Sequence, residues 1–137
     1  MKLPRIAIVA TVAVLAAAAI LAVGGGISAA HTAKYKTKVT INFQPGTYAD
    51  RFFGKVKSKN PACIKKRTVK VYRQKSGPDV LFGTDTTNKK GKYLVAPGKH
   101  AKSGGGYYAK AKKRVLKKNS LHKHVCRAGT SRTITVP

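Results

Sequence analysis

The sequence predicts an all-β fold, a seven-stranded Greek-key β-sandwich over residues 31–137 with one disulfide. Three observations lead to this prediction. Short segments in which apolar and polar residues alternate recur along the chain. Clusters of Gly, Pro, Asn and Asp separate these segments. No segment has the period of a convincing amphipathic helix, and residues 110–121 come nearest to one.

Residues 1–30 have the pattern of a secretory signal peptide, an apolar helix that precedes the sandwich. Lys2 and Arg5 come before an apolar run at residues 6–23, and small residues lead up to Ala30. We expect cleavage after Ala30. The alternative is an uncleaved membrane anchor through residues 6–23, a run close to the roughly 20 residues that a spanning helix needs. Either outcome places the remaining chain outside the cytoplasm, secreted or at the cell surface.

Seven strands are expected in the remaining chain. They cover residues 35–43, 51–58, 67–75, 80–84, 92–96, 107–113 and 131–136. The first alternates along its whole length, which is typical of a half-buried strand. The third should turn Val69 and Val71 inward, and the last should bury Ile134 and Val136. The fourth is short and is expected at a sheet edge.

The sixth strand, residues 107–113, divides its side chains clearly between two faces. Tyr107, Ala109 and Ala111 share one face, and Tyr108 shares the other with two lysines. Successive side chains of a strand point to opposite sides of a sheet, so this division is typical of a strand.

The two cysteines, Cys63 and Cys126, are predicted to form a disulfide. An exported domain folds under oxidising conditions, which favour such a bridge. Closing a loop of this size stabilises a fold by roughly 4 kcal/mol in the chain-entropy model. Two free thiols and intermolecular pairing are the alternatives.

The excess of basic over acidic residues is the feature that most limits the possible functions. The chain has 29 Lys and Arg against three acidic residues, a formal net charge of +26. The acids are Asp50, Asp79 and Asp85, all in turn-like contexts. Acid–base catalysis by paired carboxylates needs two acids close together, and no serine has the surroundings of an activated nucleophile. We therefore expect no enzyme and no cofactor.

Basic residues concentrate in two segments that flank the cysteines. A clustered basic face attracts phosphate, sulfate or carboxylate polymers by releasing counterions, without reading a sequence. We predict contact with anionic polymers or an anionic membrane surface, and no sequence-specific nucleic-acid binding. The alternative is a structural or interaction scaffold whose charge only keeps the protein soluble. The predicted contact residues are Lys65, Lys66, Arg67, Lys110, Lys112, Lys113, Arg114, Lys117 and Lys118.

Histidines supply a weaker metal hypothesis. His122, His124 and Cys126 alternate, so an extended chain would turn them to one side, where they could bind copper or zinc. Cleavage after Ala30 would also place the amine and imidazole of His31 together at the N-terminus. Cys126 is better explained by pairing with Cys63, and the loop is rich in cations. We favour exposed histidines and predict no metal site.

The order of landmarks from Phe52 to Val136 resembles the carboxypeptidase regulatory-like domains, which are transthyretin-like β-sandwiches of secreted bacterial proteins. The landmarks are Phe52 to Val56, Cys63, Arg67 to Arg73, Asp79-Val80, Gly83 to Tyr93, Gly106 to Ala111, and Cys126 with the strand after it. The resemblance implies a non-catalytic accessory module. It also implies that both cysteines lie in loops at one end of the sandwich, and that residues 110–129 include a long basic loop clamped by the disulfide.

Overall fold

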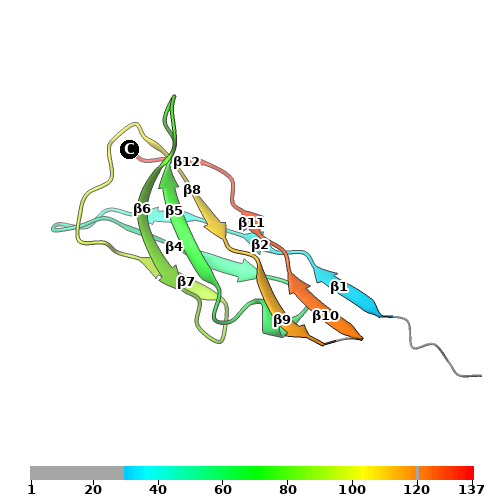
Figure 1. The fold of residues 1–137 in the computed structure, drawn as a ribbon. Helices are drawn as coiled ribbons and strands as arrows, with labels where there is room; N and C mark the ends of the chain where they lie inside the picture. The colour runs from blue at the N-terminus through cyan, green and yellow to red at the C-terminus, as the bar shows by residue number, and fades with distance from the viewer. Residues whose placement is uncertain (1–29, 120) are drawn as a thin grey trace, which may run out of the picture.

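The computed structural model describes residues 30–119 and 121–137, and these residues form an all-β fold (Figure 1). The predicted signal peptide falls almost wholly outside the described residues. Within the described part of the chain, no helix is long and apolar enough to cross a membrane.

The described residues contain twelve strands and one 3-10 helix. In chain order they are β1 (His31–Tyr35), β2 (Lys38–Val39), β3 (Asn42–Gln44), β4 (Arg51–Lys57), the helix η1 (Pro61–Cys63), β5 (Thr68–Arg73), β6 (Val80–Thr86), β7 (Lys92–Val95), β8 (Gly106–Ala111), β9 (Arg114–Lys118), β10 (His122–Cys126), β11 (Gly129–Thr130) and β12 (Ile134–Thr135).

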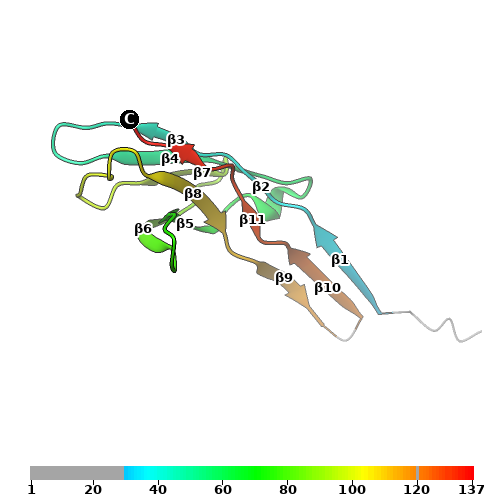
Figure 2. The ribbon, with the colours of Figure 1, turned by 90° about the horizontal axis from the view of Figure 1, so that it is seen from above.

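These strands form three sheets. The five-stranded sheet has the order β11-β8-β5-β6, and β12 also pairs with β8. The four-stranded sheet has the order β2-β4-β3, and β7 also pairs with β4. The three-stranded sheet has the order β1-β10-β9, in which β1 runs parallel to β10. Two views show this third sheet extending away from the other two (Figures 1 and 2).

The core lies between the five-stranded and four-stranded sheets. Phe52 of β4 is fully buried, with its ring centroid 4.7 Å from that of Tyr107 and 5.0 Å from that of Phe82. Val69 and Val71 are also fully buried, as their alternation predicts. Burying such side chains removes apolar surface from water, which is the main force that joins the two sheets.

The sixth strand divides between two faces as predicted, and the predicted burial of the last strand is confirmed with one difference. Tyr107, Ala109 and Ala111 are buried, and so is Val136. Ile134 packs against the core but is only partly buried. The fourth predicted strand corresponds to β6, and its predicted position at a sheet edge is confirmed, because β6 is the outermost strand of the five-stranded sheet.

Two predicted segments differ from the structure. Residues 35–43 keep their alternating burial, but the strand is divided between β1, β2 and β3, which belong to two sheets. Residues 110–129 are not a long loop, because β9 and β10 form an antiparallel hairpin within them. The side-chain oxygen of Asn119 accepts hydrogen bonds from the backbone N–H groups of Leu121 and His122, and this turn reverses the chain.

The disulfide between Cys63 and Cys126 is confirmed, with 5.4 Å between the two Cα atoms. Both cysteines are fully buried. Since Cys63 ends η1 and Cys126 ends β10, the bridge ties the three-stranded sheet to the loop that follows β4.

Candidate functional site

The structure brings together the two basic segments that flank the cysteines. Arg114 at the start of β9 donates from Nη1 to the carbonyl oxygen of Lys65, at 2.8 Å. The run of basic residues extends from the end of β8 into β9. These two strands follow one another along a nearly straight line (Figure 1). We call this surface the basic strip. It comprises Lys65, Lys66, Lys110, Lys112, Lys113, Arg114 and Lys118.

Two of the nine predicted contact residues are not counted in the basic strip. Lys117 belongs to β9, but its side chain lies outside the described part of the structure. Arg67 was predicted to contact the polymer, and the structure corrects this prediction, because the side chain of Arg67 has no solvent-exposed surface. A polymer at the surface has no access to the guanidinium of a residue buried in this way.

Arg67 instead links four segments inside the protein. Its Nη1 donates to the carbonyl of Cys63 at 2.7 Å and to the hydroxyl of Thr37 at 3.2 Å. Its Nη2 donates to the carbonyls of Lys112 at 2.6 Å and Arg127 at 2.9 Å. Its Nε has no hydrogen-bond partner among the described residues. Burial, and then the nearby charge of Arg114, lower the pKa of Arg67 below its usual value.

The sheet registers place lysine directly opposite lysine four times. The pairs are Lys38 with Lys57, Lys55 with Lys92, Lys70 with Lys110, and Lys118 with Lys123. Facing residues have Cβ atoms about 5 Å apart, and like charges at this separation destabilise a sheet. Sequence reasoning missed six of these eight lysines as site candidates, because register between distant strands cannot be read from the local pattern.

No lysine or arginine of the described residues forms a salt bridge with an acid. The one ion pair found there joins His100 to Asp50. Asp79 accepts a hydrogen bond from the hydroxyl of Tyr108 at 2.8 Å, and Asp85 accepts from the backbone N–H of Leu94 at 2.7 Å. The carboxylates therefore accept hydrogen bonds at turns and strand ends. The charge of the lysines is neutralised by solvent ions or by a ligand.

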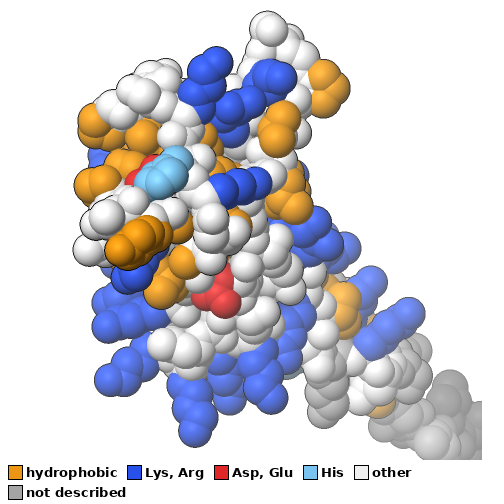
Figure 3. Space-filling view, turned by 90° about the vertical axis from the view of Figure 1, so that its left-hand side faces the viewer, with side chains coloured by type: hydrophobic (Ala, Val, Ile, Leu, Met, Phe, Trp, Pro, Cys, Tyr) orange, Lys and Arg blue, Asp and Glu red, His pale blue; other side chains and the backbone are white. Residues whose placement is uncertain are grey.

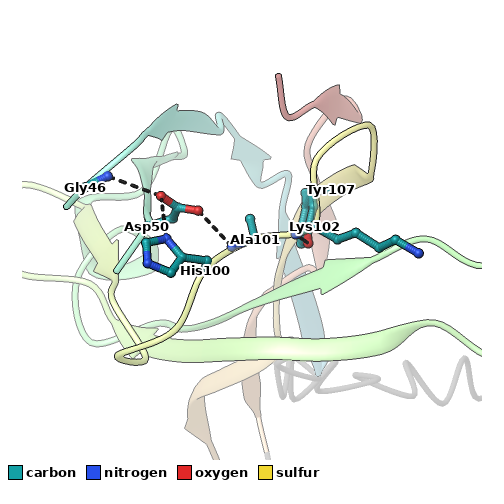
Figure 4. A network of polar contacts seen from close by, with 6 residues as sticks. All are labelled: Gly46, Asp50, His100, Ala101, Lys102 and Tyr107. Carbon is teal, nitrogen blue, oxygen red and sulfur yellow. Dashed lines mark hydrogen bonds and ion pairs between the residues drawn. The ribbon is translucent and has the colours of Figure 1, made fainter. Parts of the chain in front are cut away.

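Asp50 holds together the loop that follows β3 and the loop that follows β7 (Figure 4). Its carboxylate accepts from the backbone N–H of Ala101 at 2.8 Å and from that of Gly46 at 3.1 Å. The side chain of His100 lies 3.5 Å from the same carboxylate. The bond from Ala101 is the largest cause that lowers the pKa of Asp50, and the bond from Gly46 and the contact with His100 lower it further. This network positions loops and offers no nucleophile.

Basic side chains are not confined to the strip. Lys and Arg surround most of the face drawn in Figure 3, while hydrophobic side chains gather in its upper left. The facing lysine pairs likewise occur in all three sheets. Local concentration of charge, and not its confinement to one end of the fold, is therefore the property that marks a candidate site.

Three histidines gather in the three-stranded sheet. His31 of β1 stands in register with His122 of β10, and their Nδ1 atoms are 2.9 Å apart. The ring of His124 lies 5.9 Å from that of His31, centroid to centroid. Cys126 is bridged to Cys63, which removes the thiolate from the set of His122, His124 and Cys126 that alternation suggested. No group of three or more His, Cys, Asp or Glu residues in the described ranges is placed to hold a metal ion.

Comparison with protein-family models, with curated proteins and with solved structures gave no match. The site itself must therefore carry the functional argument.

Proposed function

We propose that the protein is a non-catalytic, secreted or cell-surface module that binds anionic polymers through the basic strip. The observation that carries this proposal is the lysine-on-lysine pairing across the strands, in a protein whose described lysines have no acidic partner. Solubility needs charge but does not need lysines stacked against one another at a cost in stability. An anionic group bound between two facing lysines relieves that repulsion.

The shape of the basic strip suits an extended polymer. From Lys110 to Lys118 the chain passes through β8 and β9, a distance of about 26 Å at the rise of a strand. Two of the facing pairs, Lys70 with Lys110 and Lys118 with Lys123, lie at its two ends. A polymer that runs along the strip would contact several cations at once, and each contact releases counterions.

The test is a salt titration of binding to heparin, double-stranded DNA and anionic lipid vesicles. We expect tight binding to heparin and DNA near physiological salt, with a steep dependence of the affinity on salt. A variant with Lys110, Lys112, Lys113, Lys117 and Lys118 changed to Ser should flatten the slope of log K against log salt by about 4, if each lysine neutralises one phosphate. Preferential binding to vesicles would identify a membrane surface as the ligand in place of a polymer.

A matched variant controls for total charge. Lys36, Lys59, Lys75, Lys89 and Lys90 are exposed and lie outside the basic strip and the facing pairs. Changing these five to Ser removes the same charge and should leave most of the slope intact. Equal losses in the two variants would reject a dedicated site.

The spread of charge over all three sheets favours a second candidate function, a scaffold without a dedicated ligand. In that case the cations only prevent aggregation of the protein with itself. Weak binding of every anion at physiological salt is the result that this alternative expects.

The finer fold assignment also belongs to the proposal. Two sheets that share one core, with most of the landmarks between Phe52 and Val136 on β4 to β8, support a Greek-key sandwich of the carboxypeptidase regulatory-like, transthyretin-like type. Cys126 is the exception, because it lies on β10 of the third sheet. The third sheet is an addition to that plan. An experimental structure whose strand connections differ from a Greek key would overturn the assignment.

A further inference from the structure

His31 and His122 are brought together from opposite ends of the described chain. Strands β1 and β10 pair in parallel, and the two residues are direct partners in the register. The backbone N–H of His31 donates to the carbonyl of Leu121 at 2.9 Å, which fixes the start of β1 beside β10. The two rings meet edge to face with 4.5 Å between their centroids. The fold therefore holds two imidazoles against each other near one end of a sheet.

The separation of the two Nδ1 atoms fits one type of metal geometry. Imidazole nitrogens bind metal ions at about 2.0–2.1 Å, so two such ligands at a right angle lie about 2.9 Å apart, and at the tetrahedral angle about 3.4 Å apart. The observed distance is 2.9 Å. Adjacent ligands of a square-planar or octahedral ion meet this distance, and Cu²⁺ binds imidazole in such geometry more tightly than the other divalent ions of its row.

Two of the lysines nearest to the imidazoles lie on the other face of the sheet. Neighbouring residues of a strand point to opposite faces, so Lys34 of β1 and Lys123 of β10 lie on the face opposite to His31 and His122. His124 lies on the same face as His122, two residues further along β10, and Lys117 of β9 is its register partner. Its ring lies 5.9 Å from that of His31, and the three histidines together are not placed to hold one ion.

We propose that His31 and His122 form a two-histidine site for a divalent transition-metal ion, with Cu²⁺ preferred over Zn²⁺. Without metal, the 2.9 Å contact allows one ring to donate its Nδ1–H to the other. Metal binding requires the donor ring to change tautomer: Nδ1 loses its proton to solvent and Nε2 of the same ring takes one up, so that both rings bind as neutral imidazoles. Water molecules complete the coordination. The two imidazoles are not members of the basic strip, but they adjoin it, because Lys118 at its end is the register partner of Lys123. The metal titration below contains no polyanion, so its outcome does not depend on polymer binding.

The test is a titration of the full chain with Cu²⁺ alone, followed by calorimetry and electron paramagnetic resonance. We expect one bound ion whose spectrum shows coupling to imidazole nitrogens. His31→Ala and His122→Ala should each weaken binding at least tenfold and reduce the nitrogen coupling. Zn²⁺ should bind more weakly to the same two residues.

His100→Ala is the matched control, because His100 is exposed, lies outside the three-stranded sheet and contacts Asp50. This variant should bind Cu²⁺ as the unmodified protein does. His31→Asn and His122→Asn keep a polar side chain of moderate size, and thermal melts of all variants check that the sheet remains folded. Unchanged affinity in folded His31 and His122 variants, or an equal loss in His100→Ala, would overturn the proposal.

Discussion

Arg67 is the residue whose role differs most from what its type suggests. In a strongly basic chain, an arginine beside two lysines is expected at the surface. Here its guanidinium lies where several loops meet and donates hydrogen bonds to four oxygen atoms, three of them backbone carbonyls. Its fork-shaped set of donors makes this possible, since a lysine ammonium could reach only some of these acceptors.

Arg67→Met should therefore lower the free energy of unfolding by about 3 kcal/mol, because it leaves buried carbonyl oxygens without donors. Arg67→Lys should recover only part of the loss. Urea denaturation measures both, and Arg51→Met on the exposed face of β4 is the control. The salt slope of heparin binding should not change in Arg67→Met. A flatter slope with full stability would show that the guanidinium reaches the surface after all.

Tyr108 makes the stability of the folded protein depend on pH in the alkaline range. Its hydroxyl donates to Asp79, and this hydrogen bond is the largest cause that raises the pKa of Tyr108 to about 12. Because the folded state holds this proton more tightly than the unfolded state, the contribution is complete below about pH 10 and is lost as the pH rises through about 12. Burial raises the pKa of Tyr93 as well, which acts in the same direction.

Tyr108→Phe should lower the free energy of unfolding at pH values below about 10, and the difference from the unmodified protein should shrink as the pH rises toward 12. Urea denaturation at a series of pH values measures this difference. Tyr48→Phe is the control, because the side chain of Tyr48 is 90% exposed. A difference that stays constant across this pH range would mean that the bond to Asp79 does not persist in solution.

At the scale of elements, the third sheet depends on few attachments. β9 and β10 form a local hairpin, but β1 reaches them from a distant part of the sequence. The disulfide at the end of β10 and the hydrogen bonds of Arg67 to Arg127 and Lys112 connect this sheet to the rest. Loss of the bridge should therefore loosen the third sheet before the core between the other two.

Changing Cys63 and Cys126 together to Ala should reduce the free energy of unfolding by about 4 kcal/mol, the value that chain entropy gives for a loop of this size. Amide hydrogen exchange should speed up most in β1, β9 and β10 and least in β5 and β8. The unmodified protein after reduction with a dithiol should behave in the same way. Faster exchange that is uniform over all strands would contradict a local role for the bridge.

The sequence predicts some of these elements and not others, for physical reasons. Alternation reports which residues share a face of a strand, so the burial of Val69 and Val71 is predicted correctly. The hairpin of β9 and β10 was missed because its lysines weaken the apolar signal, although Asn119 at the turn was a usable clue. The parallel pairing of His31 with His122 spans 91 positions and has no local signal at all.

At the scale of the whole molecule, charge opposes folding. The chain carries a formal charge of +26, and the acidic residues are three aspartates, each occupied by hydrogen bonds within the fold. A net charge far from zero destabilises a compact state through self-repulsion. The disulfide and the aromatic core compensate for this repulsion, and a bound polyanion would reduce it.

The facing lysine pairs allow local repulsion to be separated from total charge. Lys55→Glu places an acid opposite Lys92, whereas Lys89→Glu makes the same change of net charge in an exposed turn. At low salt, Lys55→Glu should be the more stable of the two by about 0.5 kcal/mol, because it turns a repulsive cross-strand pair into an attractive one. Lys55→Gln, which only removes the repulsion, should fall between them.

Thermal and urea denaturation at several salt concentrations measure this difference, which should shrink toward zero near 1 M salt as the Debye length falls to about 3 Å. Lys55→Glu should also weaken heparin binding if the pair on β4 and β7 takes part in it. Higher stability together with a larger loss of affinity than in Lys89→Glu would show that the lysine pairing is maintained for a ligand at the expense of the fold. Equal stability in Lys55→Glu and Lys89→Glu at every salt concentration would mean that only total charge matters, as the scaffold alternative requires.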